Sequence, residues 1–346
     1  MSRCGIASID DLFEGRSATP IGPGTTDQAA VSEIQDFLRC QGFPGLPGLL
    51  GPGRGVFGPK TQEAVRGFRS AHSLGDGESV DSATLRALVE TPATRPLASR
   101  AYLALALGID IQGMAWIVSL TSHFESARSF SAMCLNTDRA GLSFGLIQWA
   151  QKPGRLNEIL RAFDQADHAR FVAVFGAGDE SLAQGLLAHT ARPDGGVDTQ
   201  TGVATNPAFD LIHDPWPARF QAAALERGWQ RVQCETAIAD FSDSYQRLKP
   251  STPQIRSERG VAFLLDLANQ HGEGGARSIY RAAARPGASE PEVLAAMADE
   301  SVRRLVAQFG ADSAAVKATI DRRTFFRTTN LLADAGFEDL AASARA

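Results

Sequence analysis

A short segment with two prolines divides this chain. Residues 91–99 read TPATRPLAS, and their prolines and low apolar content predict a linker. On both sides of this linker, apolar residues recur mostly at the spacing of helices. We therefore predict a mainly α protein, with a flexible polar arm at 1–29, a small three-helix domain at 30–90 and an α-rich domain at 100–346.

The small domain is expected to bury one face of each helix. Thr61 is placed to cap its second helix, and Asp81 or Ser82 its third. The glycine-rich stretch 42–55 has far too few triplets for a collagen helix, so we interpret it as a long loop. The apolar residues at helical spacing are Val31, Ile34, Phe37, Leu38, Ala64, Val65, Phe68, Leu85 and Leu88.

The large domain is predicted to be helical with a short β element. Apolar periodicity indicates helices around 111–125, 216–247 and 258–271, and two or three more within 276–335. A short β-ribbon is expected near 137–147. The sequence has no βαβ rhythm and no glycine pattern of a nucleotide-binding loop, which excludes the common nucleotide-dependent folds.

The net charge and the distribution of apolar residues indicate which kinds of partner the chain can bind. A net charge of −5 argues against nucleic acid, because phosphate binding needs a basic face. The start of the chain, MSRCGIASIDDLFEG, lacks the apolar run of a secretory signal, and no stretch approaches the about 20 apolar residues of a membrane span. We expect a monomer that is made in the cytoplasm. Widely spaced cysteines predict free thiols, at Cys4, Cys40, Cys134 and Cys234.

Two carboxylates carry the clearest chemical pattern. Glu125 ends the apolar helix expected at 111–125, and Asp138 opens the polar turn DRAGLSFG. A carboxyl group against apolar walls tends to keep its proton, whereas one in a polar turn stays ionised. Such a pair across a cleft can cleave a glycosidic bond, with Glu125 as the acid and Asp138 as the base. The structural alternative pairs Glu125 with Arg128 and places Asp138 in an Asx turn.

Other polar residues are secondary candidates. Ser143 is placed to hydrogen-bond the attacking water, and Gln148 and Trp149 follow the same turn and can contact sugar or simply pack. Gln270 and His271 are candidates to line the cleft, or to satisfy buried backbone groups.

Metal binding is not expected. His123 and Glu125 form a His-x-Glu pair, but residues two apart do not share a helix face. We predict no metal and no cofactor.

Residues 54–69, RGVFGPKTQEAVRGFR, resemble the peptidoglycan-binding domain found on many bacterial wall hydrolases, a three-helix unit. Arg54 stands where that family usually has Asp, and Arg69 where it usually has Gln. The resemblance implies peptidoglycan as a partner. The matching residues are Gly55, Phe57, Gly58, Pro59, Thr61, Ala64, Val65 and Phe68.

The large domain resembles the lysozyme-like superfamily. Asp138, Gly141, Ser143 and Gly145 match the catalytic turn of family-46 chitosanases, in which Thr usually stands where this chain has Ser. The stretch 145–148, GLIQ, is similar to goose-type lysozymes and lytic transglycosylases. The segment Gln270-His271-Gly272 also looks like a chitosanase stretch, although the Glu-to-Asp interval is shorter than in those enzymes.

These resemblances imply a lysozyme-like catalytic domain behind a wall-binding domain. The expected activity is a muramidase-type peptidoglycan hydrolase, as in an endolysin released by a holin or an effector delivered by a secretion apparatus. A chitosanase and a lytic transglycosylase are the alternatives within this superfamily. A non-catalytic wall-binding or phage structural protein is the alternative of another class.

Overall fold

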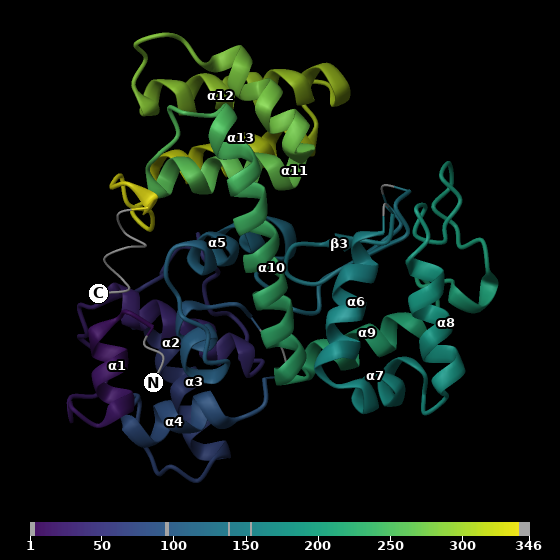
Figure 1. The fold of residues 1–346 in the computed structure, drawn as a ribbon. Helices are drawn as coiled ribbons and strands as arrows, with labels where there is room; N and C mark the ends of the chain where they lie inside the picture. Colours follow the sequence, from purple (N-terminus) through teal and green to yellow (C-terminus); the bar gives the residue numbers. More distant parts are fainter. Residues whose placement is uncertain (1–3, 94–96, 138, 153, 339–346) are drawn as a thin grey trace. The chain divides into compact units, whose positions relative to one another are not determined.

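The computed structural model describes residues 4–93, 97–137, 139–152 and 154–338 (Figure 1). It confirms the mainly α class with a small β element. The chain forms two compact units: unit 1 contains the residues up to 111 and 125–237, and unit 2 contains 112–124 and the residues from 238 on. Of the three boundaries between the units, 111/112 precedes α5 (Met114–Ser126), 124/125 falls within α5, and 237/238 falls within α10 (Arg227–Leu248).

Unit 1 holds the N-terminal helices, the sheet and a second helical group. Its elements are α1 (Ala7–Glu14), α2 (Gln28–Cys40), α3 (Pro59–Ala71), α4 (Ser82–Glu90), the π-helical turn η1 (Tyr102–Ala106), β1 (Met133–Leu135), β2 (Leu142–Phe144), β3 (Trp149–Ala150), α6 (Arg155–Ala166), α7 (His168–Phe175), α8 (Glu180–Thr190), η2 (Pro207–Phe209) and α9 (Trp216–Leu225).

The helix predicted over 216–247 is two helices. Extended backbone at Glu226, with ψ of 114°, separates α9 from α10. The cysteines are free thiols, as predicted.

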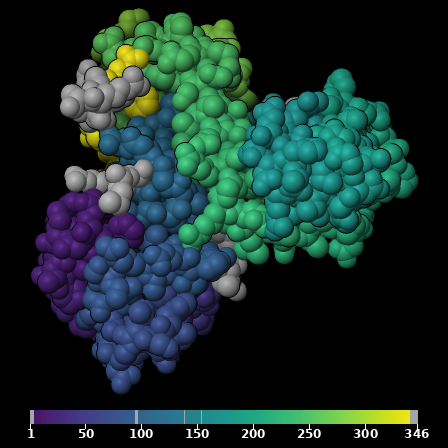
Figure 2. All heavy atoms as spheres, turned by 60° about the horizontal axis from the view of Figure 1, so that its bottom comes forward, coloured from purple at the N-terminus to yellow at the C-terminus, as the bar shows by residue number. Residues whose placement is uncertain are grey.

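Residues 4–29 are not a flexible arm, and that prediction is wrong. Backbone hydrogen bonds of 3.0 and 2.8 Å join Ile21 to Val80, and Arg86 of α4 donates to the Phe13 carbonyl at 2.8 Å. In Figure 2 the atoms of this segment, in purple, continue without a break into the blue atoms of the following helices. Although the segment is polar on average, it contains the amphipathic helix α1, which buries Ile9 and Leu12.

The predicted linker is also packed where the structure describes it. Residues 97–99 are buried, and Leu97 forms a β-bridge with Ser129. Tyr102, at the start of η1, is also buried, and its hydroxyl donates to Gln230 Oε1 at 2.6 Å. The linker prediction therefore fails at 97–99, because backbone pairing and burial fix those residues to the rest of unit 1.

The first helices are joined to α10 by a helix cap. Arg227 donates to the carbonyls of Val89, Glu90 and Thr91 at 2.6, 2.9 and 3.1 Å. These acceptors lie at the end of α4, where backbone carbonyls lack partners within the helix. The N-terminal domain is thus an integral part of unit 1.

The sheet is small and antiparallel, with the order β1-β2-β3 among the described residues. Ser143 at the centre of β2 faces Cys134 on one side and Ala150 on the other. It lies at the position expected for the ribbon, and β2 is buried along its whole length.

Unit 2 is a helical body. Its elements besides parts of α5 and α10 are η3 (Lys249–Ser251), α11 (Glu258–Ala283), α12 (Glu290–Phe309) and α13 (Ala314–Thr328). Within α11, Gly272 has φ 69° and ψ 162°, a conformation essentially restricted to glycine, and it breaks the helix directly after His271. No helix in the described part of the chain is long and apolar enough to cross a membrane.

Candidate functional site

Glu125 lies in the last turn of α5, as predicted, and its side chain is half-buried. The helix residues before it, Trp116, Ile117 and Val118, are buried. Directly after the last helical residue, Ser126, Ala127 has φ 51° and Arg128 has φ 65°. Left-handed backbone ends a helix, so the carboxylate is held at the end of an apolar segment.

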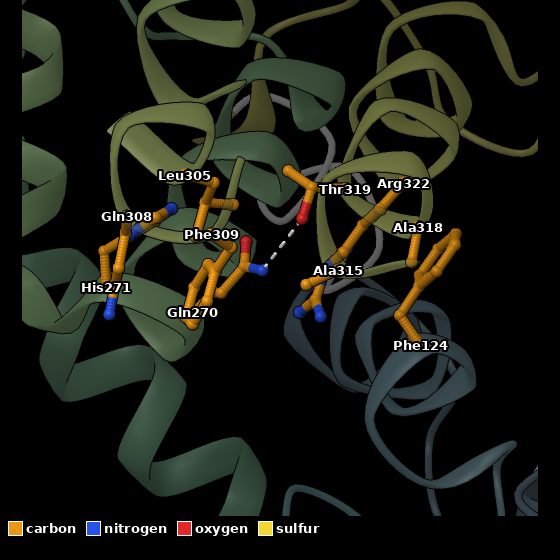
Figure 3. A pocket seen from close by; sticks show the side chains of 10 residues that line it. All are labelled: Phe124, Gln270, His271, Leu305, Gln308, Phe309, Ala315, Ala318, Thr319 and Arg322. Atoms are coloured by element: carbon orange, nitrogen blue, oxygen red, sulfur yellow. Dashed lines mark hydrogen bonds between the residues drawn. The ribbon is translucent and has the colours of Figure 1, made fainter. Parts of the chain in front are cut away.

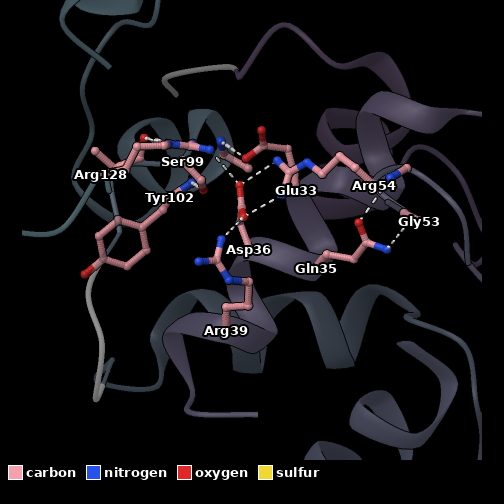
Figure 4. Close-up of polar contacts among 12 residues, drawn as sticks. Glu33, Gln35, Asp36, Arg39, Gly53, Arg54, Ser99, Tyr102 and Arg128 are labelled. Carbon is pink, nitrogen blue, oxygen red and sulfur yellow. Dashed lines mark hydrogen bonds and ion pairs between the residues drawn. The ribbon is translucent and has the colours of Figure 1, made fainter. Parts of the chain in front are cut away.

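The loop after Glu125 is anchored by a buried charge cluster (Figure 4). Arg128 donates from Nη1 to Asp36 Oδ2 at 2.9 Å, and from Nε and Nη2 to the Ala98 carbonyl at 3.0 and 2.8 Å. Arg54 donates to both Asp36 oxygens at 2.7 Å. Arg39 Nη1 donates to Asp36 Oδ1 at 3.2 Å. Asp36 has no exposed surface, so its charge is stabilised by these three arginines.

Two carboxyls in this cluster have shifted pKa values. Burial opposes ionisation of Asp36, but Arg128 and Arg54 outweigh it and hold the pKa of Asp36 at about 2. Burial, and then the charge of Asp36, raises the pKa of Glu33. The Glu33 carboxyl accepts the Ala101 N–H at 2.9 Å, so it binds the backbone just past the predicted linker.

The two arginines that depart from the family pattern bind inside the protein. Arg54 forms the bidentate pair with Asp36 just described. Arg69 donates to Asp81 at 2.8 Å, to Thr84 at 2.6 Å and to the Leu74 carbonyl at 2.6 Å. Their positive charges therefore stabilise the domain and are not presented as an exposed basic surface.

The turn that contains Asp138 is closed on either side, although Asp138 itself lies outside the described residues. Asn136 donates its N–H to the Gly141 carbonyl at 2.9 Å and accepts the Gly141 N–H on Oδ1 at 3.1 Å. Gly141 has φ 72°, and a Cβ there would lie 2.5 Å from Gln151 Oε1. The fold alone therefore requires this glycine of the predicted catalytic turn.

The predicted sugar contact at Trp149 is not supported by its position. The Trp149 side chain has no exposed surface, because β3 buries it in unit 1. Ser143 is also buried, with 5% exposure. The amide of Gln148 donates to the carbonyls of Ala132 at 3.2 Å and Gly145 at 3.0 Å. Gln148 and Trp149 thus fit the packing alternative, and Ser143 remains a prediction.

Two buried glutamines that no sequence pattern indicated, Gln151 and Gln233, bind the backbone beside this sheet. Gln151 accepts the Leu142 N–H on Oε1 at 3.1 Å and donates to the Gly195 carbonyl at 3.0 Å. Gln233 accepts the Leu146 N–H at 3.1 Å and donates to the Phe130 carbonyl at 3.1 Å. No spacing in the sequence marks these amides, because three of their four partners lie 44, 87 and 103 positions away.

Unit 2 contains a pocket of about 450 Å³ that includes both of the remaining predicted residues. Gln270 and His271 line it, with the amide of Gln270 donating to Thr319 Oγ1 at 3.3 Å (Figure 3). The other lining residues are Phe124, Leu305, Gln308, Phe309, Ala315, Ala318 and Arg322.

His271 is neutral in this setting. Burial, and then the positive charges of Arg323, Arg304 and Arg322, together lower the pKa of His271 to about 4. Its Nε2 hydrogen-bonds Ser301 Oγ at 3.1 Å. His271 is therefore a neutral hydrogen-bonding wall of the pocket at neutral pH.

Behind the pocket lies a second buried charge cluster. Asp266, with no exposed surface, accepts from Arg322 Nε at 2.8 and 2.9 Å and from Arg322 Nη2 at 2.7 Å. Arg323 pairs with the same carboxylate and donates to Gln270 Oε1. The structure thus brings Gln270 and His271 together in unit 2, and Ser143, Gln148 and Trp149 together at the sheet of unit 1.

Among the described residues, no group of three or more His, Cys, Asp and Glu side chains is placed to hold a metal ion. The His123 ring packs edge-on against Phe124, with centroids 4.9 Å apart.

Residues 27–88 match the family described as "Putative peptidoglycan binding domain". This match confirms the resemblance of the N-terminal domain. Comparison with curated proteins gives no match. A solved chain described as "Chitosanase complex structure" is similar to this one, with a TM-score of 0.41 and 19% sequence identity, over 63% of this chain and 92% of that chain.

Proposed function

We propose that this protein is a glycoside hydrolase that cleaves the glycan strands of peptidoglycan. The observation that carries the proposal is the peptidoglycan-binding domain at 27–88, packed in the same unit as the Glu125 carboxylate. A domain that holds the wall polymer raises the local concentration of glycosidic bonds at a site on the same chain.

Each residue has a role in the proposed mechanism. Glu125, half-buried at the end of an apolar helix, donates a proton to the leaving oxygen. Asp138 activates a water on the opposite face of the sugar, and Ser143 hydrogen-bonds that water. Inversion follows if the two carboxyl groups stand roughly 6.5–9.5 Å apart.

The buried charge cluster supports the proposed role of Glu125 indirectly. An acid catalyst must be held in a fixed geometry to transfer its proton efficiently. Arg128, three residues after Glu125, is tied to Asp36 and to the Ala98 carbonyl. The peptidoglycan-binding domain thereby helps to fix the end of the helix that carries the acid.

A wall hydrolase must reach the wall. We propose delivery by holin-mediated release or by a specialised secretion apparatus.

The proposal is tested by replacing Glu125 with Gln and measuring the release of dye-labelled fragments from purified peptidoglycan. General acid catalysis is worth about 10²–10⁴-fold, so E125Q is expected to lose activity by about that factor while retaining wall binding. Glu235→Gln, which changes an exposed carboxylate on α10, is the matched control and should keep full activity. An E125Q protein as active as the wild type would refute the assigned role.

A further inference from the structure

The 194–205 loop lies between α8 and η2 in unit 1 and is closed on itself. Asp198 accepts the backbone N–H and the hydroxyl of Thr201, both at 2.8 Å. At the base of the loop, a backbone bridge joins Val197 to Ala204. The Thr201 hydroxyl, and then the backbone N–H groups beside it, lower the pKa of Asp198, so its carboxylate is ionised and keeps the loop closed at neutral pH.

This loop contacts the turn at 136–141. The side chain of Asn136 donates from Nδ2 to the Thr201 carbonyl at 3.0 Å. Lys152, which follows the strand β3, donates from Nζ to the Thr199 carbonyl at 2.8 Å. Two side chains therefore bind backbone carbonyls of the loop and hold it against the edge of the sheet region.

Asn136 holds the turn as well as the loop. Its carbonyl accepts the Arg139 N–H at 3.3 Å, and its own N–H donates to the Gly141 carbonyl at 2.9 Å. Its side-chain Oδ1 accepts the Gly141 N–H at 3.1 Å. One residue thus connects the loop with the segment in which Asp138 stands in the sequence.

A glycine allows the loop to approach the turn this closely. Gly202 has φ 71°, and a Cβ there would lie 1.9 Å from Asn136 Oδ1 and 2.8 Å from the carbonyl carbon of Arg139. Any other residue would therefore displace the loop or the turn. Gly178, in the same unit, has φ 88°, but a Cβ there would meet nothing within 4 Å. Comparing the two glycines separates close packing from backbone strain.

We propose that the 194–205 loop positions Asp138 for catalysis, and that Asn136 is the positioning residue that links the loop to it. This inference rests on the proposed function, in which Asp138 activates the attacking water. Thr137 and Arg139 are exposed, so burial does not fix this segment and hydrogen bonds have to. A displacement of about 1 Å in a reacting group can lower the rate by about 10²-fold.

The kinetic test measures cleavage of soluble, uncross-linked peptidoglycan strands by full-length variants. Asn136→Gly removes the amide and keeps a backbone that adopts positive φ readily. We expect N136G to lower kcat by about 10²-fold with little change in KM. In an Asp138→Asn background the same change should have no further effect, because a positioning residue acts only through the group that it positions. A purely structural role for Asn136 would lower the rate equally in both backgrounds.

Hydrogen exchange tests the support itself, without depending on activity. We expect Gly202→Ala to speed exchange of the amides in 136–142 by about fivefold, the factor that corresponds to one hydrogen bond. Gly178→Ala is the matched control for backbone strain and should leave these amides unchanged. Exchange within 27–88 should be unchanged in both variants, which shows that the fold is kept.

The inference is overturned if N136G lowers the rate equally with and without Asp138, or if G202A exchanges in 136–142 as slowly as G178A. Failure of the proposed function has a different readout, which is a wild-type protein that cleaves no peptidoglycan or a D138N protein as active as the wild type. Faster exchange in G202A together with an inactive wild type would show that the loop supports the turn, and would refute its role in catalysis.

Discussion

Two fully buried aspartates, one in each unit, are paired with arginines in different surroundings. Asp36 in unit 1 is bound by its neighbour Arg39 and by Arg54 and Arg128, which come from distant parts of the sequence. Asp266 in unit 2 is bound by Arg322 and Arg323, which are adjacent on one helix. A buried ion pair gives little net stability by itself, but removing one partner is costly.

The two clusters differ in their surroundings, because one connects chain segments and the other borders a pocket. The Asp36 cluster also contains Glu33 and joins the N-terminal domain to the backbone at Ala98 and to the loop after Glu125. The Asp266 cluster adjoins an open pocket through Arg322. The same pairing chemistry thus fixes two segments in unit 1, and in unit 2 it fixes a side chain that lines a cavity.

The largest expected effect is that of Asp36→Ala. It leaves Arg54 and Arg128 without their shared carboxylate, and we expect the free energy of unfolding to fall by about 3–5 kcal/mol. Equilibrium denaturation measures the change. Asp11→Ala, which breaks an exposed ion pair in the same unit, is the control and should cost no more than about 1 kcal/mol. A cost for D36A as small as the control would show that the cluster does not join these segments.

Asp266→Asn is expected to have a smaller effect on stability, because the amide keeps the shape and one acceptor oxygen. A loss of about 1.5–3 kcal/mol in the free energy of unfolding is expected, typical of hydrogen bonds to charged groups. Asp334→Asn, at an 81% exposed side chain, is the control. If D266N costs as little as this control, the cluster does not stabilise unit 2.

The smallest expected effect is a pH dependence at Glu33. Its pKa is raised above the ordinary value of 4.5, so the folded state retains this proton to a higher pH than the unfolded state. Its favourable contribution is therefore complete below the unfolded value and is lost as pH rises through the folded value. Glu33→Gln avoids that loss, so the stability of E33Q relative to wild type should rise as pH increases from below the ordinary Glu value. Denaturation over a series of pH values measures this, and a difference independent of pH would contradict it.

The sequence predicted what depends on local pattern. Helical periodicity gave the α class, and the turn and helix around Gly58 and Phe68 identified the N-terminal domain. Glu125 was placed at a helix end for the same reason. Each of these depends on neighbours within a few turns, which the sequence displays directly.

The buried ion pairs and the burial of particular side chains could not be predicted, because they depend on residues far apart in the sequence. Asp36 and Arg128 are 92 positions apart, and each is a charged residue of a type that is usually exposed. Trp149 suited sugar contact by its chemistry, but the sheet buries it completely. The segment 4–29 is polar on average, although Ile9, Leu12 and Ile21 are buried and its backbone bonds to Val80 and to Arg86 of α4. Burial is decided by the whole fold, so composition along a segment does not determine it.

The most direct test of the central claim is to digest purified peptidoglycan and chitosan in parallel with the wild-type protein and to identify the products by mass spectrometry. The account predicts muropeptides with reducing ends from peptidoglycan and no oligomers from chitosan. Anhydro ends would retain peptidoglycan cleavage but replace hydrolysis with transglycosylation. Chitosan oligomers without muropeptides, or no product from either polymer, would contradict the claim.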